Sequence, residues 1–133
     1  MEDTAALEAV ARVARDRAYA PYSRFRVGCA LEADDGTVYD GCNVENASFG
    51  LTMCAERVAA GHAIAAGRRA FVRMLIVTDA STPVAPCGAC RQVLSEFAPG
   101  LDVYSVSGRG EMSHWTLNYL LPDRFEISAG GGE

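Results

Sequence analysis

The apolar residues of this chain recur first at helical and then at strand spacing, which predicts a mixed α/β protein. Leu7 and Ala14 lie on one apolar face of a helix predicted over residues 4–18. Glycine and proline punctuate the later segments, where they end helices and form turns. The other predicted elements are a β-hairpin over 26–42 with Asp34-Asp35-Gly36 at its turn, a helix over 54–67, a strand over 72–78, a helix from about 87 to 98, a strand over 101–106 and a short last strand near 115–117.

This order of elements, α-β-β-α-β-α-β-β, predicts an α/β fold, a three-layer α/β/α sandwich around one mixed five-stranded sheet. At 133 residues, half of them hydrophobic, the chain is long enough for one domain with an ordinary core. We expect that domain to span residues 1–127. Residues 128–133 are mostly small, and we expect them to form a flexible tail.

Charge and cysteine content narrow the classes of partner and compartment. Seventeen acidic residues against twelve basic ones give a net charge of −5, and the basic residues form no stripe, so a nucleic-acid partner is disfavoured and a small substrate is favoured. No apolar run approaches the ~20 residues of a membrane span, and the N-terminus lacks the regions of a signal peptide. Five cysteines, an odd number, argue against a pure disulfide framework, so we expect a cytoplasmic protein with reduced thiols and no membrane partner.

Three cysteines in two short segments carry the strongest chemical signal. Cys54 begins the second predicted helix, and Cys87 and Cys90 form a C-x-x-C pair at the start of the third. Backbone N–H groups and the positive end of the helix dipole favour thiolates at both places. Catalytic zinc is held by three protein ligands and keeps an open position. We therefore expect one Zn²⁺ per subunit, bound by these three cysteines.

Glu56 lies two residues after Cys54 and makes the predicted zinc site a catalytic one. A carboxylate that stands beside zinc without binding it acts first as general base and then as general acid. Zinc lowers the pKa of a water bound to it to about 7, so hydroxide is available at neutral pH. This chemistry adds water across a C=N bond and expels ammonia, and a glutamate with a later Pro-Cys-x-x-Cys is the layout of zinc deaminases.

Two arginines next to the ligands are candidates for tuning the metal. Arg57 lies one helical turn after Cys54, and Arg91 directly follows Cys90. We expect either guanidinium to donate a hydrogen bond to a ligand sulfur, because three thiolates place excess negative charge on a +2 ion.

Two other interpretations of the cysteines stay open. A closed structural zinc site would take a fourth cysteine as ligand and would leave Glu56 without a role. Alternatively, Cys87 and Cys90 would form a redox pair. The fourth ligand of the closed site would be Cys29 or Cys42, which we otherwise expect to be small apolar strand residues. We expect His62 and His114 to be surface or hydrogen-bonded polar residues, not ligands.

With these motifs in place, the chain resembles the small, homotetrameric cytidine deaminases with a three-cysteine zinc site. The likeness covers roughly residues 5–126 and is carried by the segments PYSRFRVG (21–28), GCNVENAS (41–48), PCGACRQVL (86–94) and LLPDRF (120–125). It implies zinc-dependent hydrolytic deamination of cytidine and 2′-deoxycytidine to uridine and 2′-deoxyuridine, with release of ammonia, in pyrimidine salvage. It also implies a homotetramer.

The resemblance implies roles for residues that bind the nucleoside. Asn43 and Glu45 would hydrogen-bond the sugar hydroxyls, chiefly the 3′-OH, because an amide and a carboxylate together supply donors and acceptors. Phe25 would pack on the face of the base. The alternatives are a turn after the second strand for the polar pair and an ordinary core position for Phe25.

Further implied roles concern the base and the subunit interfaces. The backbone N–H of Ala55 would meet O2 of the base, and the carbonyl of Pro86 would accept from the 4-amino group. Glu56 would hold N3 and move protons. Phe125 of a neighbouring subunit would close the pocket, or would be a plain C-terminal anchor, and residues 47–49 of another subunit would touch the pocket.

Three places depart from the family pattern. Phe49 stands where tyrosine is common, Met53 is bulky for its position, and residues 108–119 differ from the usual segment before Leu-Leu-Pro. Three other functions stay open: deamination of a modified cytosine nucleoside such as a blasticidin-type antibiotic, editing of DNA or RNA, and a non-catalytic structural zinc module. The unbroken Asn43-Val44-Glu45 favours an unmodified sugar, and the net negative charge disfavours a polymer.

Overall fold

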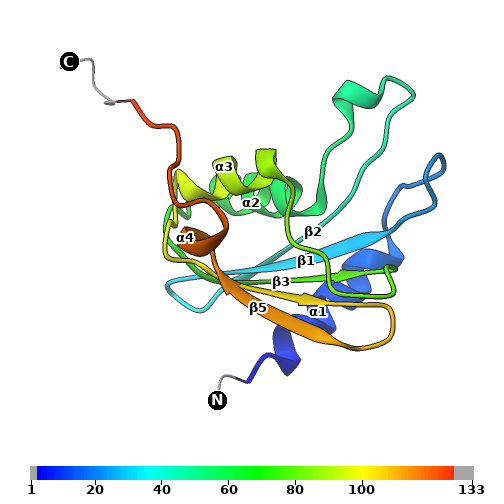
Figure 1. Cartoon of the computed structure of the whole chain (residues 1–133), viewed down its shortest axis with the longest axis horizontal. Coiled ribbons are helices and arrows are strands. Elements are labelled where there is room, and N and C mark those ends of the chain that lie inside the picture. Colours follow the sequence, from blue (N-terminus) through cyan, green and yellow to red (C-terminus); the bar gives the residue numbers. More distant parts are fainter. Residues whose placement is uncertain (1–2, 128–133) are drawn as a thin grey trace.

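The computed structural model describes residues 3–127 and confirms a three-layer α/β sandwich around one five-stranded sheet (Figure 1). The predicted tail, residues 128–133, lies outside the described residues. The elements in chain order are α1 (Ala5–Asp16), β1 (Val27–Ala33), β2 (Val38–Cys42), the 3-10 helix η1 (Phe49–Leu51), α2 (Ala55–Ala65), β3 (Phe71–Thr78), α3 (Gly88–Ser95), β4 (Asp102–Val106), β5 (Met112–Thr116) and α4 (Leu117–Leu120).

The sheet is mixed and has the strand order β2-β1-β3-β4-β5. β1 pairs antiparallel with both β2 and β3, and β5 pairs antiparallel with β4. β3 and β4 are parallel, and the chain returns between them through α3. The carboxyl ends of β3 and β4 therefore share one edge of the sheet, and the segment that leaves β3 there leads directly to Cys87.

Each face of the sheet has its own apolar layer. On one face, Leu7 and Ala11 of α1 pack with Leu75 and Val77 of β3. On the other face lie α2, α3 and α4 (Figure 1), and the alanines of α2 pack with strand side chains such as Leu31. Burial of one large aliphatic side chain contributes about 1.5–3 kcal/mol, so these two layers fix both helix layers on the sheet.

Two glycines let the helices approach the strands closely. A Cβ on Gly41 of β2 would lie 2.5 Å from the carbonyl oxygen of Ala55 and would also overlap Ala59 of α2. A Cβ on Gly28 of β1 would lie 2.5 Å from the backbone nitrogen of Arg15 in α1. The contact at Gly41 positions the first turn of α2, which begins directly after Cys54.

The structure departs from the sequence prediction in three details. α3 ends at Ser95 rather than near residue 98. The backbone N–H groups of Phe97 and Ala98 both donate to the carbonyl of Leu94, which closes the helix before Pro99. The last strand begins earlier than predicted, at Met112. Two short elements, η1 and α4, are each too brief to show an apolar period.

Candidate active site

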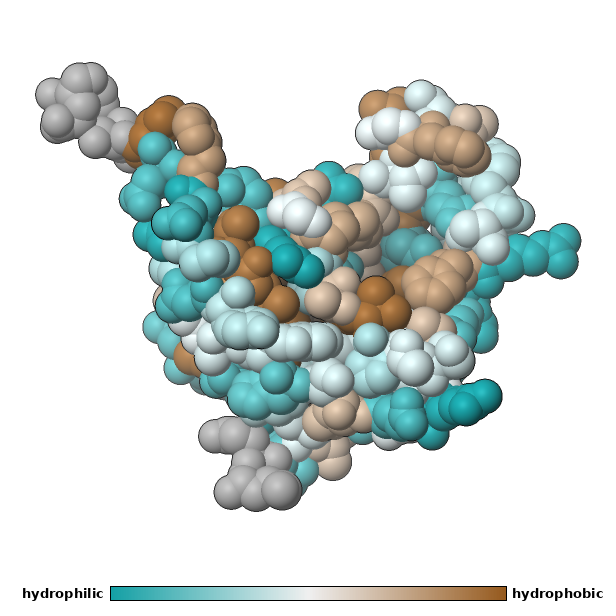
Figure 2. All heavy atoms as spheres, in the orientation of Figure 1, coloured by the Kyte–Doolittle hydropathy of each residue, from teal (hydrophilic) through white to brown (hydrophobic). Residues whose placement is uncertain are grey.

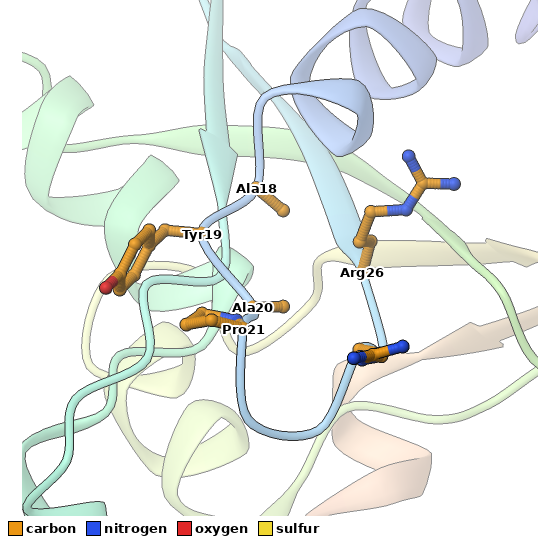
Figure 3. Close-up of a pocket in the computed structure, with 6 residues that line it drawn as sticks. Ala18, Tyr19, Ala20, Pro21 and Arg26 are labelled. Atoms are coloured by element: carbon orange, nitrogen blue, oxygen red, sulfur yellow. The ribbon is translucent and has the colours of Figure 1, made fainter.

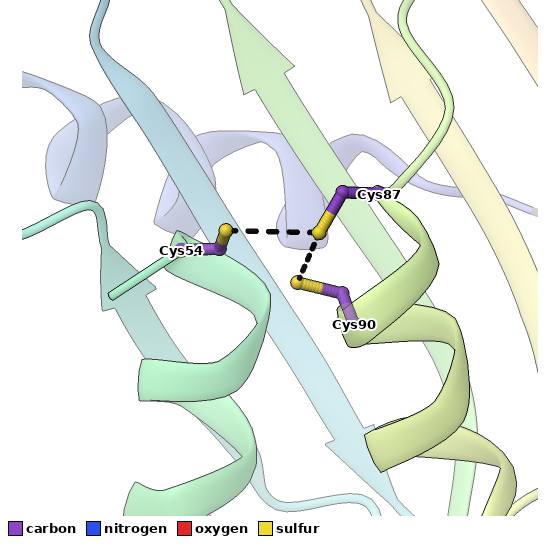
Figure 4. Close-up of side chains that lie close together, drawn as sticks. All are labelled: Cys54, Cys87 and Cys90. Atoms are coloured by element: carbon purple, nitrogen blue, oxygen red, sulfur yellow. Dashed lines mark hydrogen bonds between the residues drawn. The ribbon is translucent and has the colours of Figure 1, made fainter. Parts of the chain in front are cut away.

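The three predicted ligands converge where α2 and α3 begin (Figure 4). Cys54 is the N-cap residue of α2, Cys87 is the N-cap residue of α3, and Cys90 follows in the first turn of α3. The Sγ atoms of Cys54 and Cys87 are 3.8 Å apart, those of Cys87 and Cys90 are 3.4 Å apart, and all three lie within 4.8 Å of one another. Sulfurs on a tetrahedral zinc, with Zn–S bonds of 2.3 Å, are separated by about 3.8 Å. The donor set and its spacing therefore fit a zinc ion.

The thiols of this cluster shift one another's pKa values through hydrogen bonds. A hydrogen bond with the Cys90 thiol, reinforced by Arg57, lowers the pKa of Cys54 to about 5. The same hydrogen bond, together with burial, raises the pKa of Cys90. Cys54 thus ionises more readily than Cys90, and zinc binds cysteine as the thiolate.

The two arginines have different partners. Arg57 meets the prediction, because its Nη2 donates to Cys54 Sγ at 3.5 Å. The expectation that Arg91 would donate to a sulfur is wrong: its Nε donates to the carbonyl of Pro86 at 2.8 Å and its Nη1 to that of Leu120 at 2.9 Å. Neighbouring residues on a helix point in different directions, whereas residues three apart share a face. In the structure Arg91 is directed to two carbonyls, whereas Arg57 lies beside the sulfur of Cys54.

Glu56 lies beside the cysteines without belonging to the ligand group of the described residues. It is in the first turn of α2, and only 6% of its surface is exposed. Burial raises the pKa of its carboxyl to about 7, with a smaller contribution from the charge of Cys54. A carboxyl that titrates near neutral pH both takes and returns a proton, which suits general acid–base chemistry.

A cavity of about 300 Å³ opens above Glu56 and the cysteines. Its lining includes five of the sequence-predicted residues: Phe25, Asn43, Glu45, Ala55 and Glu56, besides the ligands Cys54 and Cys87. Sequence reasoning missed several other lining residues, namely Ser23, Val27, Thr52, Ile76, Thr78, Val84 and Ala85. Thr78 had a usable signal, because it ends a predicted buried strand, and ligands often bind at the carboxyl edge of such strands.

The predicted sugar-binding pair is buried and already engaged in hydrogen bonds. Asn43 donates through Nδ2 to the carbonyl of Phe25 at 2.8 Å and accepts from the N–H of Val27 at 2.9 Å. Glu45 accepts from backbone N–H groups of the 21–27 loop, which leads into β1 and ends at its first residue. Hydrogen bonds, chiefly from Ser23, keep the pKa of Glu45 below its usual value. These contacts reach across to another loop, so the pair does not form the local turn considered as its alternative.

The two predicted phenylalanines are both outside the core. Phe25 lines the cavity and is 38% exposed. Phe125 is 71% exposed and, within residues 3–127, is not among the lining of this cavity. The side chain of Gln92 holds its backbone, accepting from the N–H of Phe125 at 3.1 Å and donating to its carbonyl at 2.8 Å. The Phe125 side chain is thus exposed and apart from the residues that line this cavity.

The remaining cysteines and histidines lie apart from the ligand group in the described part of the chain. Cys29 is fully buried in the core, and Cys42 is at the end of β2. His62 contacts Asp40 at 3.3 Å, and His114 contacts Asp102 at 2.9 Å, both at the surface. The described residues thus bring no fourth cysteine to the site, as a closed structural zinc would require.

A second hollow, of about 430 Å³, lies on the outer side of the 21–27 loop (Figure 3). Ala18, Tyr19 and Pro21 form its apolar wall, and Arg24 and Arg26 supply its charges. Its lining contains no carboxylate or thiol, so it has none of the groups of the acid–base site.

No helix among residues 3–127 combines the length and apolar character needed to cross a membrane.

Comparison with known proteins agrees with this geometry. The family model for the cytidine and deoxycytidylate deaminase zinc-binding region matches residues 1–105. A cytidine deaminase of Sporosarcina psychrophila is 47% identical over 92% of this chain and 91% of that protein. One from Halalkalibacterium halodurans is 50% identical over 84% of this chain and 86% of that protein. The crystal structure of the Burkholderia pseudomallei cytidine deaminase superposes with a TM-score of 0.89 at 48% identity, covering 93% of this chain and all of that one. The chain therefore belongs to the cytidine deaminase family.

Proposed function

We propose that this protein deaminates cytidine and 2′-deoxycytidine hydrolytically, with zinc, to uridine and 2′-deoxyuridine. The observation that carries the proposal is the buried Glu56 carboxyl, with a pKa of about 7, next to a cluster of three thiols at zinc-binding distances. Glu56 and two of these cysteines line one cavity. The named relatives are cytidine deaminases, which supports the choice of substrate.

The ligands Cys54, Cys87 and Cys90 would hold the ion, and zinc bound there supplies Lewis acidity that favours ionised water at neutral pH. Glu56 takes the proton of the attacking water and delivers it to N3 as oxygen adds to C4. Glu56 then takes the proton of the new hydroxyl group on C4 and passes it to the 4-amino group. The C4–N bond breaks, ammonia leaves, and C4 becomes the carbonyl carbon of the product. One water is consumed for each ammonia released, and Glu56 ends in its starting state.

Backbone groups near the cavity floor orient the base in this proposal. The N–H of Ala55, at the start of α2, donates to O2 of the base. The carbonyl of Pro86 accepts from the 4-amino group, and the hydrogen bond from Arg91 fixes the direction of that carbonyl. Ala55 directly follows Cys54 and Pro86 directly precedes Cys87, so both groups position the base relative to the metal.

Side chains of two loops hold the rest of the nucleoside. Phe25 packs on the base, and Asn43 and Glu45 bind the sugar hydroxyls from the wall of the cavity. The hydroxyls meet a carboxylate that stays ionised well below neutral pH, because hydrogen bonds lower its pKa.

The test is cytidine turnover by the zinc-loaded protein, compared with a Glu56→Gln variant whose zinc is quantified. We expect kcat to fall by about 10²–10⁴-fold with zinc retained, because only the proton transfer is lost. Glu96→Gln, the same change at an exposed position next to α3, is the control and should retain full activity. Zinc-loaded wild-type protein that leaves both nucleosides unchanged would overturn the proposal.

We further propose that residues 1–127 act as one unit in a homotetramer. Apolar side chains protrude from the segment between β2 and α2 that carries η1, and from the C-terminal segment (Figure 2). Phe49 and Leu51 of η1 are 75% and 67% exposed, and Phe125 of the C-terminal segment is 71% exposed. Such exposed apolar groups on a small domain favour burial between copies. Phe125 of one copy would close the pocket of another, and residues 47–49 of a third would touch it.

Light scattering tests the tetramer, which should give about 56 kDa for four 14.1 kDa chains. Mixed subunits test the shared pocket. A Phe125→Ala variant supplies an intact Glu56, and a Glu56→Gln variant supplies an intact Phe125, so hybrids should be more active than either parent. Equal activity before and after mixing would contradict the role of Phe125.

We also propose a reducing compartment, the cytoplasm, and a role in pyrimidine salvage. Three thiol ligands must stay reduced to bind metal, which a cytoplasmic setting ensures. A cavity that takes a free nucleoside supports recycling of nucleosides. Fractionation of the host cell with an antibody to this protein tests the compartment, and loss of growth on cytidine as the pyrimidine source after gene deletion tests salvage.

A further inference from the structure

The loop before β1 presents alternate residues to two different hollows. Ser23, Phe25 and Val27 line the cavity above Glu56, whereas Arg24 and Arg26 line the outer hollow (Figure 3). The loop is therefore the wall between the two, and its exact course decides what faces the nucleoside.

Hydrogen bonds from side chains, not from a neighbouring strand, hold much of this wall. The N–H groups of Tyr22 and Ser23 donate to Oε1 of Glu45 at 2.9 and 3.1 Å. Arg24 has a φ of 59°, in the left-handed region that costs a non-glycine residue of order 1–3 kcal/mol. The contacts to Glu45 on one side and to Asn43 on the other keep this residue in place.

Ser23 is the residue that joins the carboxylate to the aromatic side of the pocket. Its hydroxyl donates to Oε2 of Glu45 and accepts from the N–H of Phe25 at 3.0 Å. It is exposed and lines the cavity, so a nucleoside would lie beside it.

The hydrogen bonds to Glu45 leave one acceptor site of its carboxylate unused. A carboxylate offers about four acceptor sites, two on each oxygen. The two N–H groups occupy Oε1, and the Ser23 hydroxyl occupies one site on Oε2. One acceptor site on Oε2 remains, and its direction depends on the hydroxyl that holds the other.

We propose that Ser23 is a positioning residue that aims the free acceptor site of Glu45 Oε2 at the 3′-hydroxyl of the sugar. The inference rests on the proposed nucleoside deamination. Its specific consequence is that the Ser23 hydroxyl matters for substrates with a 3′-hydroxyl and much less for those without one. A residue that only supported the loop would affect both kinds of substrate alike through Phe25.

The experiment compares cytidine with 3′-deoxycytidine as substrates of wild type and Ser23→Ala. We expect the KM for cytidine to rise about tenfold, as for loss of a hydrogen bond to a charged group. The KM for 3′-deoxycytidine should change less than about twofold, and kcat should change little for either. Ser23→Thr, which keeps the hydroxyl at an exposed position, should retain the wild-type ratio of the two KM values.

Ser23→Cys is a second test variant in case Ser23→Ala does not fold. It is close to serine in size but donates weakly, so it should shift the KM ratio in the same direction as Ser23→Ala. An equal rise in both KM values, or no change in either, would overturn the proposal. Failure of wild type to turn over cytidine would instead overturn the proposed function, so the two failures are distinguishable.

Discussion

The two ends of the cavity are built in different ways. At the metal end, Cys54, Glu56 and Cys87 occupy the cap or first turn of α2 or α3, so regular backbone geometry sets their positions. At the other end, which we propose binds the sugar and call the sugar end, Ser23 and Glu45 lie on loops that hold each other through side-chain hydrogen bonds.

This difference suggests a division of roles, with the reaction at the helix starts and substrate recognition at the loops. Helix starts give reacting groups fixed positions and a favourable dipole, which acid–base chemistry beside a metal requires. Loops held by a few hydrogen bonds can change their polar partners one residue at a time without disturbing the core. We therefore expect substitutions at the metal end to remove activity and substitutions at the sugar end to change substrate preference.

The largest effect should follow from Cys90→Ala, which removes a buried ligand from the metal end. Two thiols should not retain zinc, so we expect kcat/KM to fall by more than about 10³-fold, because the Lewis acid contributes several kcal/mol. Metal content by atomic absorption and turnover of cytidine measure this together. Cys42→Ala, outside the ligand group, is the control and should keep zinc. Full zinc content in the Cys90 variant would show that the ligand set is assigned wrongly.

The next effect should come from Gly41→Ala, which presses β2 against α2. The new Cβ would overlap the backbone of Ala55 and Ala59, so we expect the free energy of unfolding to fall by about 3 kcal/mol. Denaturant unfolding measures it. Gly61→Ala in α2, where the added methyl group meets no atom within 4 Å, should instead raise stability by up to about 1 kcal/mol. If both variants behave alike, close packing at Gly41 does not set the position of α2.

Arg57→Ala tests the guanidinium that donates to Cys54. Loss of this contact should weaken zinc binding by about 10–100-fold, the usual effect of removing a hydrogen bond to a ligand. Competition with a zinc chelator measures the affinity. Arg12→Ala, which breaks a surface pair with Glu8 in α1, should leave it unchanged. An unchanged affinity in Arg57→Ala would mean that the contact does not stabilise the bound ion.

The smallest effect should appear at the sugar end. Asn43→Ala removes two hydrogen bonds that hold the 21–27 loop, so we expect the free energy of unfolding to fall by about 1–2 kcal/mol and the KM for cytidine to rise. Zinc content should stay at the wild-type level. A loss of zinc in this variant would show that the two ends of the cavity are not independent.

The helices and strands followed from the sequence where an apolar pattern or a helix-ending residue marks them. The apolar period of α1 predicted that helix, a continuous apolar run predicted β3, and Gly67 marked the end of α2. The 3-10 helix η1 and the single turn of α4 have no such period. α4 depends instead on local contacts, such as the Thr116 side chain that accepts from the N–H of Tyr119.

The candidate site was predictable where spacing alone fixes direction. Cys54 and Arg57 are three residues apart on a helix, so their contact could be expected. The partners of Arg91 could not, because the carbonyl of Leu120 comes close only through the packing of α4 beside α3. The link between Ser23 and Glu45 joins two loops, and no periodic pattern reports such a contact.

The position of the ligands has a consequence for folding. A metal shared by Cys54 and Cys87 joins segments 33 residues apart, across the whole of β3. In the chain-entropy description, a cross-link that closes a loop of this length lowers the entropy of the unfolded chain, and this stabilises the folded state by roughly 3–4 kcal/mol at 25 °C. The ion would then act as a reversible cross-link between the two segments. The supply of metal in the cell would govern how long this protein resists proteolysis as well as its catalytic rate.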